Sequence, residues 1–411
     1  MRPDHRFGCG VAGLVLGALV SIGCDTGAPS MQGRWDAVVV VNDVEIPFRF
    51  DIVESTSGIS GAFFNGDERI ESTSGRFSDD TLTLSYDHYA TRLEANLVDG
   101  QLTGRYERAR GAPYPFRATP AVASTSAPAD VPSIGGLWHI PVKSSKGEAA
   151  WRFIVHQTGP DVSAAILRVD GDTGALTGRY QNGTFVLSHF SGQRPTLMEV
   201  ILEPDGTLAI LQNRRTKMTA VREEEAAERR VAAPTDPSRH SYARSTAEPF
   251  RFSFPDADGR VVSHADERFR NKVVIVSITG TWCPNCHDEA PFLTELHTTY
   301  RGLGLEIVAL TFEEEAQLQN PARLRAYAAR YGIEYPMLLA GIPDQLAERV
   351  PQIENLNSFP TTIFLGRDGR VRDVHAGFRS KASGRFYTET RDEIRRLVEE
   401  LLTEAAPTSE P

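Results

Sequence analysis

The chain has 411 residues, of which 24% are charged, and a formal net charge of −10. At roughly 100–200 residues per domain, this length predicts two or three domains that each bury a core of their own. The acidic balance and the lack of a dense Lys/Arg stripe argue against a nucleic-acid-binding protein, so we expect no nucleic acid among the partners.

The first predicted element is a secretory signal at residues 1–24. Two arginines precede an apolar stretch, residues 7–22, that is too short for a comfortable membrane span. Gly23 and Cys24 at its end resemble the lipobox of bacterial lipoproteins, although Ser21 stands where that family has leucine. The resemblance implies lipidation of Cys24 and a membrane-anchored lipoprotein in the periplasm or another extracytoplasmic space. Plain secretion and an uncleaved anchor are the alternatives.

The sequence contains four cysteines. Cys9 lies within the predicted signal and Cys24 at its end, so the exported body keeps only Cys283 and Cys286. A second pair, which a disulfide framework or a four-cysteine zinc site would need, is missing from the sequence.

The next two predicted regions, residues 31–117 and 134–221, are β-rich. A linker of small residues (118–133) separates them, and a polar linker (222–248) follows them. Each region contains short runs of alternating apolar and polar residues, such as FRFDIV and WRFIVH, punctuated by NG, DG and SG turns. This pattern predicts antiparallel β structure, either a barrel or a sandwich, in both regions.

The two regions are predicted to be tandem repeats. The residues that recur 103 positions later are Gly33, Trp35, Arg49, Phe50, Gly75, Arg76, Leu84 and Ser85. A rival register, with a separation of 74, rests on the string LTGRY, which occurs at 102–106 and at 176–180. The histidines of both repeats are scattered without ligand spacing, so we expect no catalytic constellation there. We expect the repeated tryptophans, Trp35 and Trp138, to fill the cores of the two repeats.

The third region, residues 249–405, changes to continuous apolar runs and helical spacing. KVVIVSI and LEIVALTF are typical of strands that are buried on both faces. Asn320 as a cap, Pro321 in the first turn and Gly332 at the exit predict a helix over NPARLRAYAARYG. A hairpin in TTIFLGRDGRVRDVHAG and a helix through RDEIRRLVEELL follow. The order strand, helix, strand, helix, hairpin, helix predicts an α/β domain with a mixed sheet.

The hexapeptide TWCPNC, residues 281–286, lies where the first of these strands ends and a helix begins. Cys283 at the helix start would meet unpaired backbone N–H groups and the positive end of the dipole, which lowers a thiol pKa from roughly 8.5. Pro284 fits the first helical turn. Cys286, three residues on, lies on the same face and can resolve a mixed disulfide. The spacing predicts an exposed attacking thiol and a shielded resolving thiol, with no cofactor.

Zinc binding and an inert structural bridge are the alternatives for a Cys-x-x-Cys motif. Zinc would need two further ligands. His287 points elsewhere on the predicted helix, and His264, His297 and His375 have no paired spacing. The pattern therefore favours redox chemistry without a metal.

The segments GTWCPNCHDEAP and SFPTTIFLGRDGRV resemble the thioredoxin-like TlpA/ResA family of exported, membrane-tethered thiol-disulfide oxidoreductases. The resemblance covers about residues 249–405 and does not reach the β repeats. It implies an α/β thioredoxin-like fold in which the peptide bond before Pro360 is cis and Pro360 faces the sulfurs. It also implies that the backbone of Phe359 and Thr361 pairs with a bound substrate strand.

The same resemblance implies roles for residues around the cysteines. Glu289 matches a buried glutamate that relays protons, and its position nearly one turn beyond Cys286 would let burial raise its pKa toward that of a useful base. An exposed first-turn glutamate is the alternative. Ordinary thioredoxins carry an aspartate where this chain has Ser277. Trp282 matches the exposed aromatic residue beside the nucleophile and, with Pro284, is expected on the substrate side.

The expected function is that of an exported enzyme that exchanges disulfides with extracytoplasmic proteins. The resemblance favours the reducing direction, with electrons from a membrane dithiol donor. A peroxiredoxin-like peroxidase is one alternative. A surface-binding lipoprotein whose β repeats carry the function, with an accessory redox domain, is another. A copper chaperone using His375 would need a third residue between the cysteines.

Overall fold

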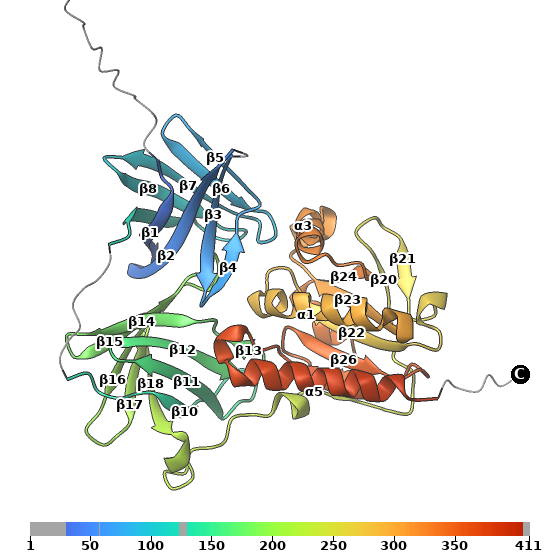
Figure 1. Ribbon diagram of the computed structural model, residues 1–411. Helices are drawn as coiled ribbons and strands as arrows, with labels where there is room; N and C mark the ends of the chain where they lie inside the picture. Colours follow the sequence, from blue (N-terminus) through green and yellow to red (C-terminus); the bar gives the residue numbers. More distant parts are fainter. Residues whose placement is uncertain (1–29, 57, 123–129, 406–411) are drawn as a thin grey trace, which may run out of the picture. The chain divides into compact units, whose positions relative to one another are not determined.

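The computed structural model describes residues 30–56, 58–122 and 130–405. The predicted signal at 1–24, with Cys9 and the lipobox-like Cys24, lies outside the described residues, as do residues 123–129 of the first predicted linker. Figure 1 traces the chain from its β-rich regions to the region that carries the long helices. Within the described residues, we find no helix with the length and apolar character that crossing a membrane requires.

The first β-rich region folds as an antiparallel sheet with strand order β4-β3-β2-β1-β9-β8-β7-β6-β5. Its strands are β1 (Gly33–Val41), β2 (Val44–Ser55), β3 (Gly58–Asn65), β4 (Glu68–Glu71), β5 (Ser74–Ser78), β6 (Thr81–Tyr86), β7 (Thr91–Val98), β8 (Gln101–Glu107) and β9 (Tyr114–Pro120). Trp35, Ala37 and Val39 alternate with more exposed residues along β1, as expected for a strand with one buried face. No strand pairing among the described residues joins β4 to β5, so this sheet is an open half-barrel.

The second β-rich region closes into a barrel. Its strands are β10 (Gly136–Pro141), β11 (Ala150–Thr158), β12 (Asp161–Arg168), β13 (Gly171–Asp172), β14 (Leu176–Gln181), β15 (Thr184–His189), β16 (Thr196–Leu202), β17 (Leu208–Gln212) and β18 (Thr216–Arg222). The sheet runs β11-β10-β18-β17-β16-β15-β14-β12-β13, and the pairing of β11 with β12 closes the ring. Trp138, Phe153 and Phe185 fill its interior, and the Trp138 indole N–H donates to the Ile134 carbonyl at 2.9 Å. The prediction of antiparallel β structure is confirmed in both regions.

The strand pairings follow the separation of 103. Trp35 pairs with Phe50 between β1 and β2, and Trp138 pairs with Phe153 between β10 and β11. The rival LTGRY match joins strands that are not equivalent. One copy lies in β8, next to β7 and β9, whereas the other lies in β14, which pairs with β12 and β15. The similarity of the two strings is therefore local.

A hairpin near the middle of each repeat also keeps this separation. Its tip is formed by residues 65–69 in the first repeat and by residues 168–172 in the second, called the first tip and the second tip below. Asn65 pairs with Glu68 in the first tip. Arg168 pairs with Gly171, 103 positions further on, in the second tip. The two tips thus share one backbone register.

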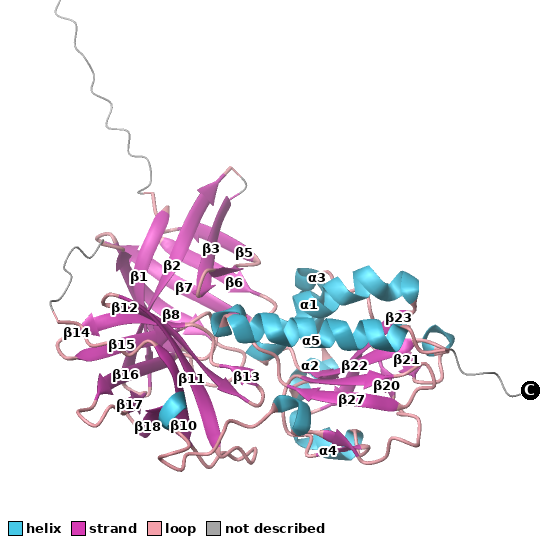
Figure 2. Cartoon of the chain, turned by 60° about the horizontal axis from the view of Figure 1, so that its bottom comes forward, coloured by secondary structure: helices cyan, strands magenta, loops and turns pink. Residues whose placement is uncertain are grey.

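The third region contains a mixed sheet with strand order β24-β23-β22-β26-β27 and helices on it (Figure 2). Its strands are β20 (Ser253–Pro255), β21 (Val261–Ser263), β22 (Val273–Thr279), β23 (Leu305–Phe312), β24 (Met337–Gly341), β25 (Ile353–Glu354), β26 (Thr361–Leu365) and β27 (Val371–Ala376). Its α-helices are α1 (Pro284–Tyr300), α2 (Glu315–Gln319), α3 (Ala322–Tyr331), α4 (Leu346–Arg349) and α5 (Arg385–Leu402). The predicted α/β layering is confirmed. The sequence pattern missed β24, because so short an apolar run has no period that separates a strand from a buried helix.

Both faces of the central strand β22 are buried. Val273 and Ile275 face a cluster that includes residues of α1, α3 and α5. Val274 and Val276 face a second cluster on the other side of the sheet, which includes Phe250. This two-sided burial explains the continuous apolar run of the strand.

The predicted cap of α3 is wrong. Asn320 ends the short helix α2, where its backbone N–H donates to the Ala316 carbonyl at 3.0 Å. Pro321 precedes the first residue of α3, Ala322, without a side-chain capping bond. At the other end Gly332 is the left-handed C-cap, with φ of 61°, as its sequence position predicted.

The predicted linker 222–248 is partly built into the third region. His240 is buried, and its Nε2 lies 2.7 Å from the Asn357 side-chain oxygen. Tyr242, in the short strand β19 (Tyr242–Ala243), pairs with Glu354 of β25. These contacts are mostly polar, which is why the composition of the segment indicated a linker.

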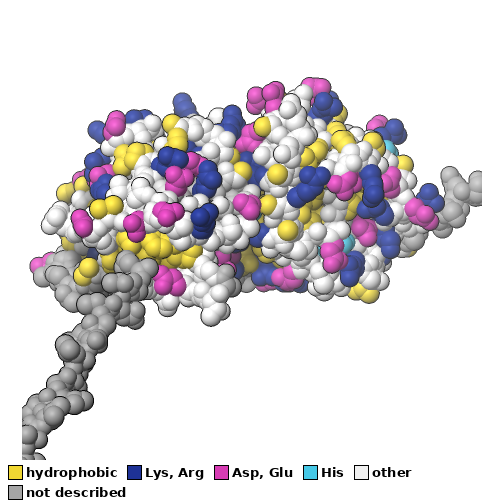
Figure 3. All heavy atoms as spheres, turned by 90° about the horizontal axis from the view of Figure 1, so that it is seen from above, with side chains coloured by type: hydrophobic (Ala, Val, Ile, Leu, Met, Phe, Trp, Pro, Cys, Tyr) yellow, Lys and Arg dark blue, Asp and Glu magenta, His cyan; other side chains and the backbone are white. Residues whose placement is uncertain are grey.

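The surface carries both signs of charge. On the face shown in Figure 3, Lys/Arg and Asp/Glu side chains lie intermingled, with small groups of hydrophobic side chains between them. No field of a single sign extends over this face.

Candidate functional site

The Cys-Pro-Asn-Cys turn connects β22 to α1. Cys283 is the N-cap of α1, with extended backbone angles, and its carbonyl accepts the N–H groups of Cys286 at 3.1 Å and His287 at 3.3 Å. Pro284 occupies the first helical position, where no N–H partner is needed. The predicted placement of the first sulfur at a helix start is confirmed.

Both thiols are buried, with 4% of Cys283 and 1% of Cys286 exposed. The prediction of an exposed attacking thiol is therefore wrong, because backbone of the second β-rich region packs on this turn, where Asp170 accepts a hydrogen bond from Asn285. The two thiols still differ in electrostatic environment. Burial opposes ionisation of Cys283, but its hydrogen bond with Cys286 and the positive charge of Arg194 outweigh it and lower its pKa. Burial raises the pKa of Cys286 well above the ordinary value, and the hydrogen bond with Cys283 adds to this. Of the two thiols, Cys283 therefore ionises more readily.

Glu289 lies on α1 behind the second sulfur and is only 2% exposed. The Thr362 hydroxyl donates to one carboxylate oxygen at 2.6 Å, and the Ser277 hydroxyl donates to the other at 3.0 Å. Burial raises the pKa of Glu289 to about 7. The alternative of an exposed first-turn glutamate is excluded by this burial. Ser277 holds this carboxylate from the position where ordinary thioredoxins carry an aspartate.

The loop before β26 faces the nucleophile. The Phe359–Pro360 peptide bond is cis, as the resemblance implied. The Cys283 thiol donates to the Phe359 carbonyl at 3.4 Å. The Phe359 ring packs edge-on against Trp282, with ring centroids 5.1 Å apart. Thr361 is buried, and its hydroxyl donates to the Ser358 carbonyl at 2.9 Å.

A buried polar network holds the residues just before Cys283, and the sequence analysis did not predict it. Glu313 accepts the Thr281 N–H at 2.8 Å and the Thr281 hydroxyl at 2.6 Å. Arg323 of α3 donates to Thr281 at 2.6 Å and to Glu313 at 2.8 Å. The available signal was a glutamate directly after β23, since parallel strands β22 and β23 end at the same edge of the sheet.

His287 belongs to this framework. Its Nε2 lies 2.8 Å from the Thr281 carbonyl and its Nδ1 lies 2.9 Å from the Tyr331 hydroxyl. Burial lowers the pKa of His287 well below its ordinary value. Among the described residues, we find no group of three or more His, Cys, Asp or Glu side chains placed to hold a metal ion.

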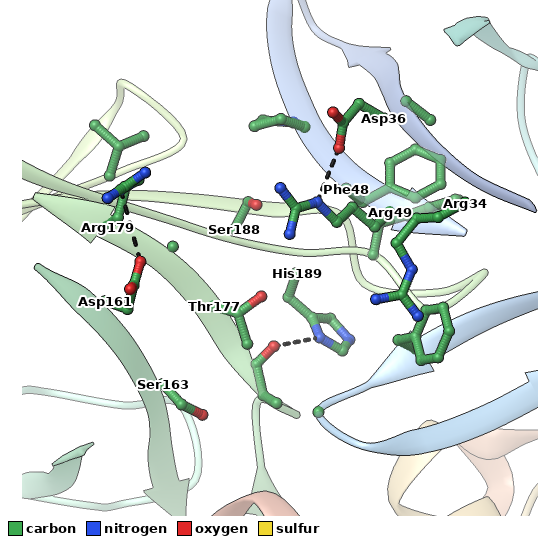
Figure 4. Close-up of a pocket in the computed structure, with 18 of the residues that line it drawn as sticks. Arg34, Asp36, Phe48, Arg49, Asp161, Ser163, Thr177, Arg179, Ser188 and His189 are labelled. Atoms are coloured by element: carbon green, nitrogen blue, oxygen red, sulfur yellow. Dashed lines mark hydrogen bonds and ion pairs between the residues drawn. The ribbon is translucent and has the colours of Figure 1, made fainter. Parts of the chain in front are cut away.

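A hollow of about 1350 Å³ is lined by both β repeats (Figure 4). Basic side chains in its lining have acidic partners on the same repeat. Arg49 is 2.8 Å from Asp36, and Arg179 is 3.6 Å from Asp161. The buried His189 has its Nδ1 3.0 Å from the Ala175 carbonyl. The hollow therefore presents satisfied pairs and not a cluster of reactive groups.

Known proteins resemble the third region. A family model described as AhpC/TSA family matches residues 247–374. The thiol-disulfide oxidoreductase ResA of Geobacillus thermodenitrificans is 28% identical over 149 residues, which span 36% of this chain and 76% of that protein. ResA of Geobacillus kaustophilus is 26% identical over 138 residues, spanning 34% and 68%. A solved structure of a putative DsbE from Chlorobium tepidum is 19% identical and covers 38% of this chain and 98% of its own, with a TM-score of 0.30.

Proposed function

We propose that this chain, a TlpA/ResA-like member of the thioredoxin family and a protein thiol-disulfide oxidoreductase, works through Cys283 as attacking thiol and Cys286 as resolving thiol. The observation that carries the assignment is the position of Cys283 as the N-cap of α1, with Cys286 in the first turn of that helix. The opposite directions of their pKa shifts agree with it. A pair at one helix start in which one thiol ionises readily and the other stays protonated is suited to sequential attack.

The proposed exchange has two steps. The Cys283 thiolate attacks one sulfur of a substrate disulfide, so that a mixed disulfide forms and the other substrate sulfur leaves as a thiolate. Cys286 then loses its proton and attacks the Cys283 sulfur, which releases the second substrate thiolate. The substrate gains two electrons and two protons, and the enzyme pair becomes a disulfide.

Glu289 is the proposed proton acceptor for Cys286. With a pKa of about 7, its carboxyl changes charge near neutral pH, where the buried Cys286 must lose its proton. Its negative charge also raises the pKa of Cys286, so the two groups lie close enough to interact.

The cis loop is the proposed docking surface for the substrate backbone. The Phe359 carbonyl already accepts the Cys283 thiol, so a strand laid along Phe359, Pro360 and Thr361 would pass beside the nucleophile. Trp282 and Pro284 flank Cys283 in the chain and are half-buried, which leaves part of each free for contact.

The direction and location are further parts of the proposal. From the signal-like residues 1–24 and the lipobox-like Gly23 and Cys24, the chain is proposed to be exported, held at the membrane by a lipid on Cys24, and to reduce disulfides of exported proteins. An oxidising compartment then requires a membrane dithiol that returns two electrons to the Cys283–Cys286 disulfide. The names of these relatives favour disulfide exchange over peroxide reduction.

Redox titration of the full chain against glutathione tests the proposal. We expect one two-electron couple that is lost in both Cys283→Ser and Cys286→Ser. Cys286→Ala should accumulate a mixed disulfide with substrate, because attack proceeds without resolution. A Cys283 that titrates like a free cysteine and forms no mixed disulfide in Cys286→Ala would contradict the assignment.

A further inference from the structure

The second tip of the barrel contacts the Cys-Pro-Asn-Cys turn, residues 283–286, which is called the redox turn below. Asn285, which lies between the two cysteines, donates from its side-chain nitrogen to the Asp170 carbonyl at 2.5 Å. Gly171 forms a parallel β-bridge with Phe378, which lies two residues after the end of β27 in the third region. Figures 1 and 2 both show β13 beside the first turns of α5.

Two glycines allow this approach. Gly171 has φ of 121°, and a Cβ there would lie 2.3 Å from the Phe378 carbonyl oxygen. Gly377 has φ of 71°, and a Cβ there would lie 2.4 Å from the Val169 carbonyl oxygen. Both positions therefore require a residue without a side chain, because each backbone lies directly against the other.

A buried carboxylate fastens the contact. Asp172 is 3% exposed and accepts the Ser380 N–H at 2.6 Å and the Ser380 hydroxyl at 2.8 Å. Arg194 of the barrel donates to the Asp172 carbonyl at 2.5 Å and adds positive charge beside Cys283. Because a buried donor without a partner is unfavourable, a side chain at position 172 without acceptor oxygens would leave the two Ser380 donors unpaired.

Apolar and aromatic side chains enclose the rest of the site. Ile154 and Leu167 of the barrel pack against Phe386 of α5. From the first repeat, the ring of the buried Tyr89 lies 4.3 Å from that of His287, at the start of α1. The redox turn is therefore covered from two sides, which accounts for the low exposure of both sulfurs.

We propose that residues 169–172 of the barrel determine which substrates reach Cys283. The proposal rests on the proposed function. The turn at residues 169–170 and the strand β13 that follows it lie against Asn285, which stands between the two cysteines, and against Phe378. A substrate reaches the sulfur by displacing this segment. Flexible, extended disulfide-bearing segments meet that requirement, whereas a rigid folded surface is excluded.

Alkylation of Cys283 in the full-length protein tests whether the segment covers it. The variant Asp172→Ala is compared with Arg69→Ala, its counterpart in the first tip, which is paired with Asp51 on the exposed side of the half-barrel. With a maleimide carrying a polyethylene glycol chain, we expect roughly tenfold to hundredfold faster modification in Asp172→Ala, as for loss of hydrogen bonds to a charged group. Arg69→Ala should react like the wild type.

A double-mutant cycle guards against general loss of structure. Ser380→Ala removes one of the two bonds from the other side of the contact, so its effect should be smaller and non-additive with that of Asp172→Ala. Additive effects, or a Cys283 that reacts at one rate in all variants, would overturn the proposal. If the circular dichroism of Asp172→Ala shows that the variant has lost structure, the alkylation rate of Cys283 in Ser380→Ala is the test. A rate equal to that of the wild type would then overturn the proposal.

Substrate preference is measured with two probes, a short disulfide-closed peptide and folded insulin. The wild type should reduce the peptide faster than insulin. In Asp172→Ala the ratio of the peptide rate to the insulin rate should fall about tenfold. An unchanged ratio, with both probes reduced, would overturn the proposal and leave the proposed function standing. Failure of every variant to reduce either probe would instead contradict the proposed function. The alkylation rates would still show whether residues 169–172 shield Cys283.

Discussion

The first and second tips have the same register and opposite surroundings. In the first tip, the Asn65 side chain accepts the Ala175 N–H of the barrel at 2.7 Å, and Glu68 reaches Lys381 at 3.5 Å. In the second tip, Asp170 and Asp172 bond to the redox turn and to the loop after β27. The same hairpin register therefore occurs twice, and in one copy the side chains and backbone contact the turn that carries the two cysteines.

The two tips differ at four of their five positions and share only Asp67 and Asp170, and two of these differences bear on the contact with the third region. Where the second tip has Gly171 and Asp172, the first has Glu68 and Arg69. A glycine permits backbone to meet backbone, and an acid accepts N–H and hydroxyl donors that an arginine cannot accept. These two residues allow the second tip to place its backbone against Phe378 and to bind Ser380, whereas the first tip contacts the third region through the ion pair of Glu68 with Lys381.

The largest expected effect comes from adding a side chain at the point of contact. Gly171→Val should lower the free energy of unfolding by about 2–5 kcal/mol, because the Cβ overlaps the Phe378 carbonyl and φ lies in the left-handed region. Glu68→Val at the matching position should change it by less than about 0.5 kcal/mol. Urea denaturation of both variants measures the two losses. Equal losses would show that the tips are energetically alike.

The pH dependence of stability that comes from Glu289 is expected to be an effect of intermediate size, and one that belongs to the third region and not to the barrel. Glu289, with a pKa of about 7 against 4.5 unfolded, binds its proton more tightly when folded, so stability falls as pH rises from 4.5 to 7. This shift corresponds to roughly 3 kcal/mol. Glu289→Gln should remove that loss and gain stability relative to the wild type at pH 8.

The same gain should occur in the Gly171→Val background, because Ser277 and Thr362 hold Glu289 without help from the barrel. Urea denaturation at pH 4 and pH 8 provides the comparison. A gain that depends on the barrel, or one of equal size at both pH values, would contradict this account.

The smallest expected effect compares one amide in each contact. Asn65→Ala and Asn285→Ala each remove a side-chain hydrogen bond to the barrel backbone and should lower stability by about 1 kcal/mol. Only Asn285→Ala should also speed alkylation of Cys283, since only that bond closes the redox turn. Faster alkylation in Asn65→Ala would show that the first tip also controls access.

Much of the architecture could be predicted from local patterns. Alternation with turn residues identified the β repeats, and the separation of 103 matched pairs such as Trp35–Phe50 and Trp138–Phe153. Apolar runs and a cysteine before proline indicated the redox turn at Cys283. These features repeat over short windows, where hydrophobic period and capping chemistry act directly.

Contacts between distant segments followed from tertiary structure alone. Composition did not distinguish a closed barrel from a half-barrel, because the ring closes only where β12 pairs with both β11 and β14. Nor did it reveal that Glu313 and Arg323 support the turn, or that Asp172 binds Ser380, 208 positions away in the chain. Sequence determines local conformation and chemical capacity, whereas burial, and with it the pKa of each sulfur, depends on which distant backbone packs over the site.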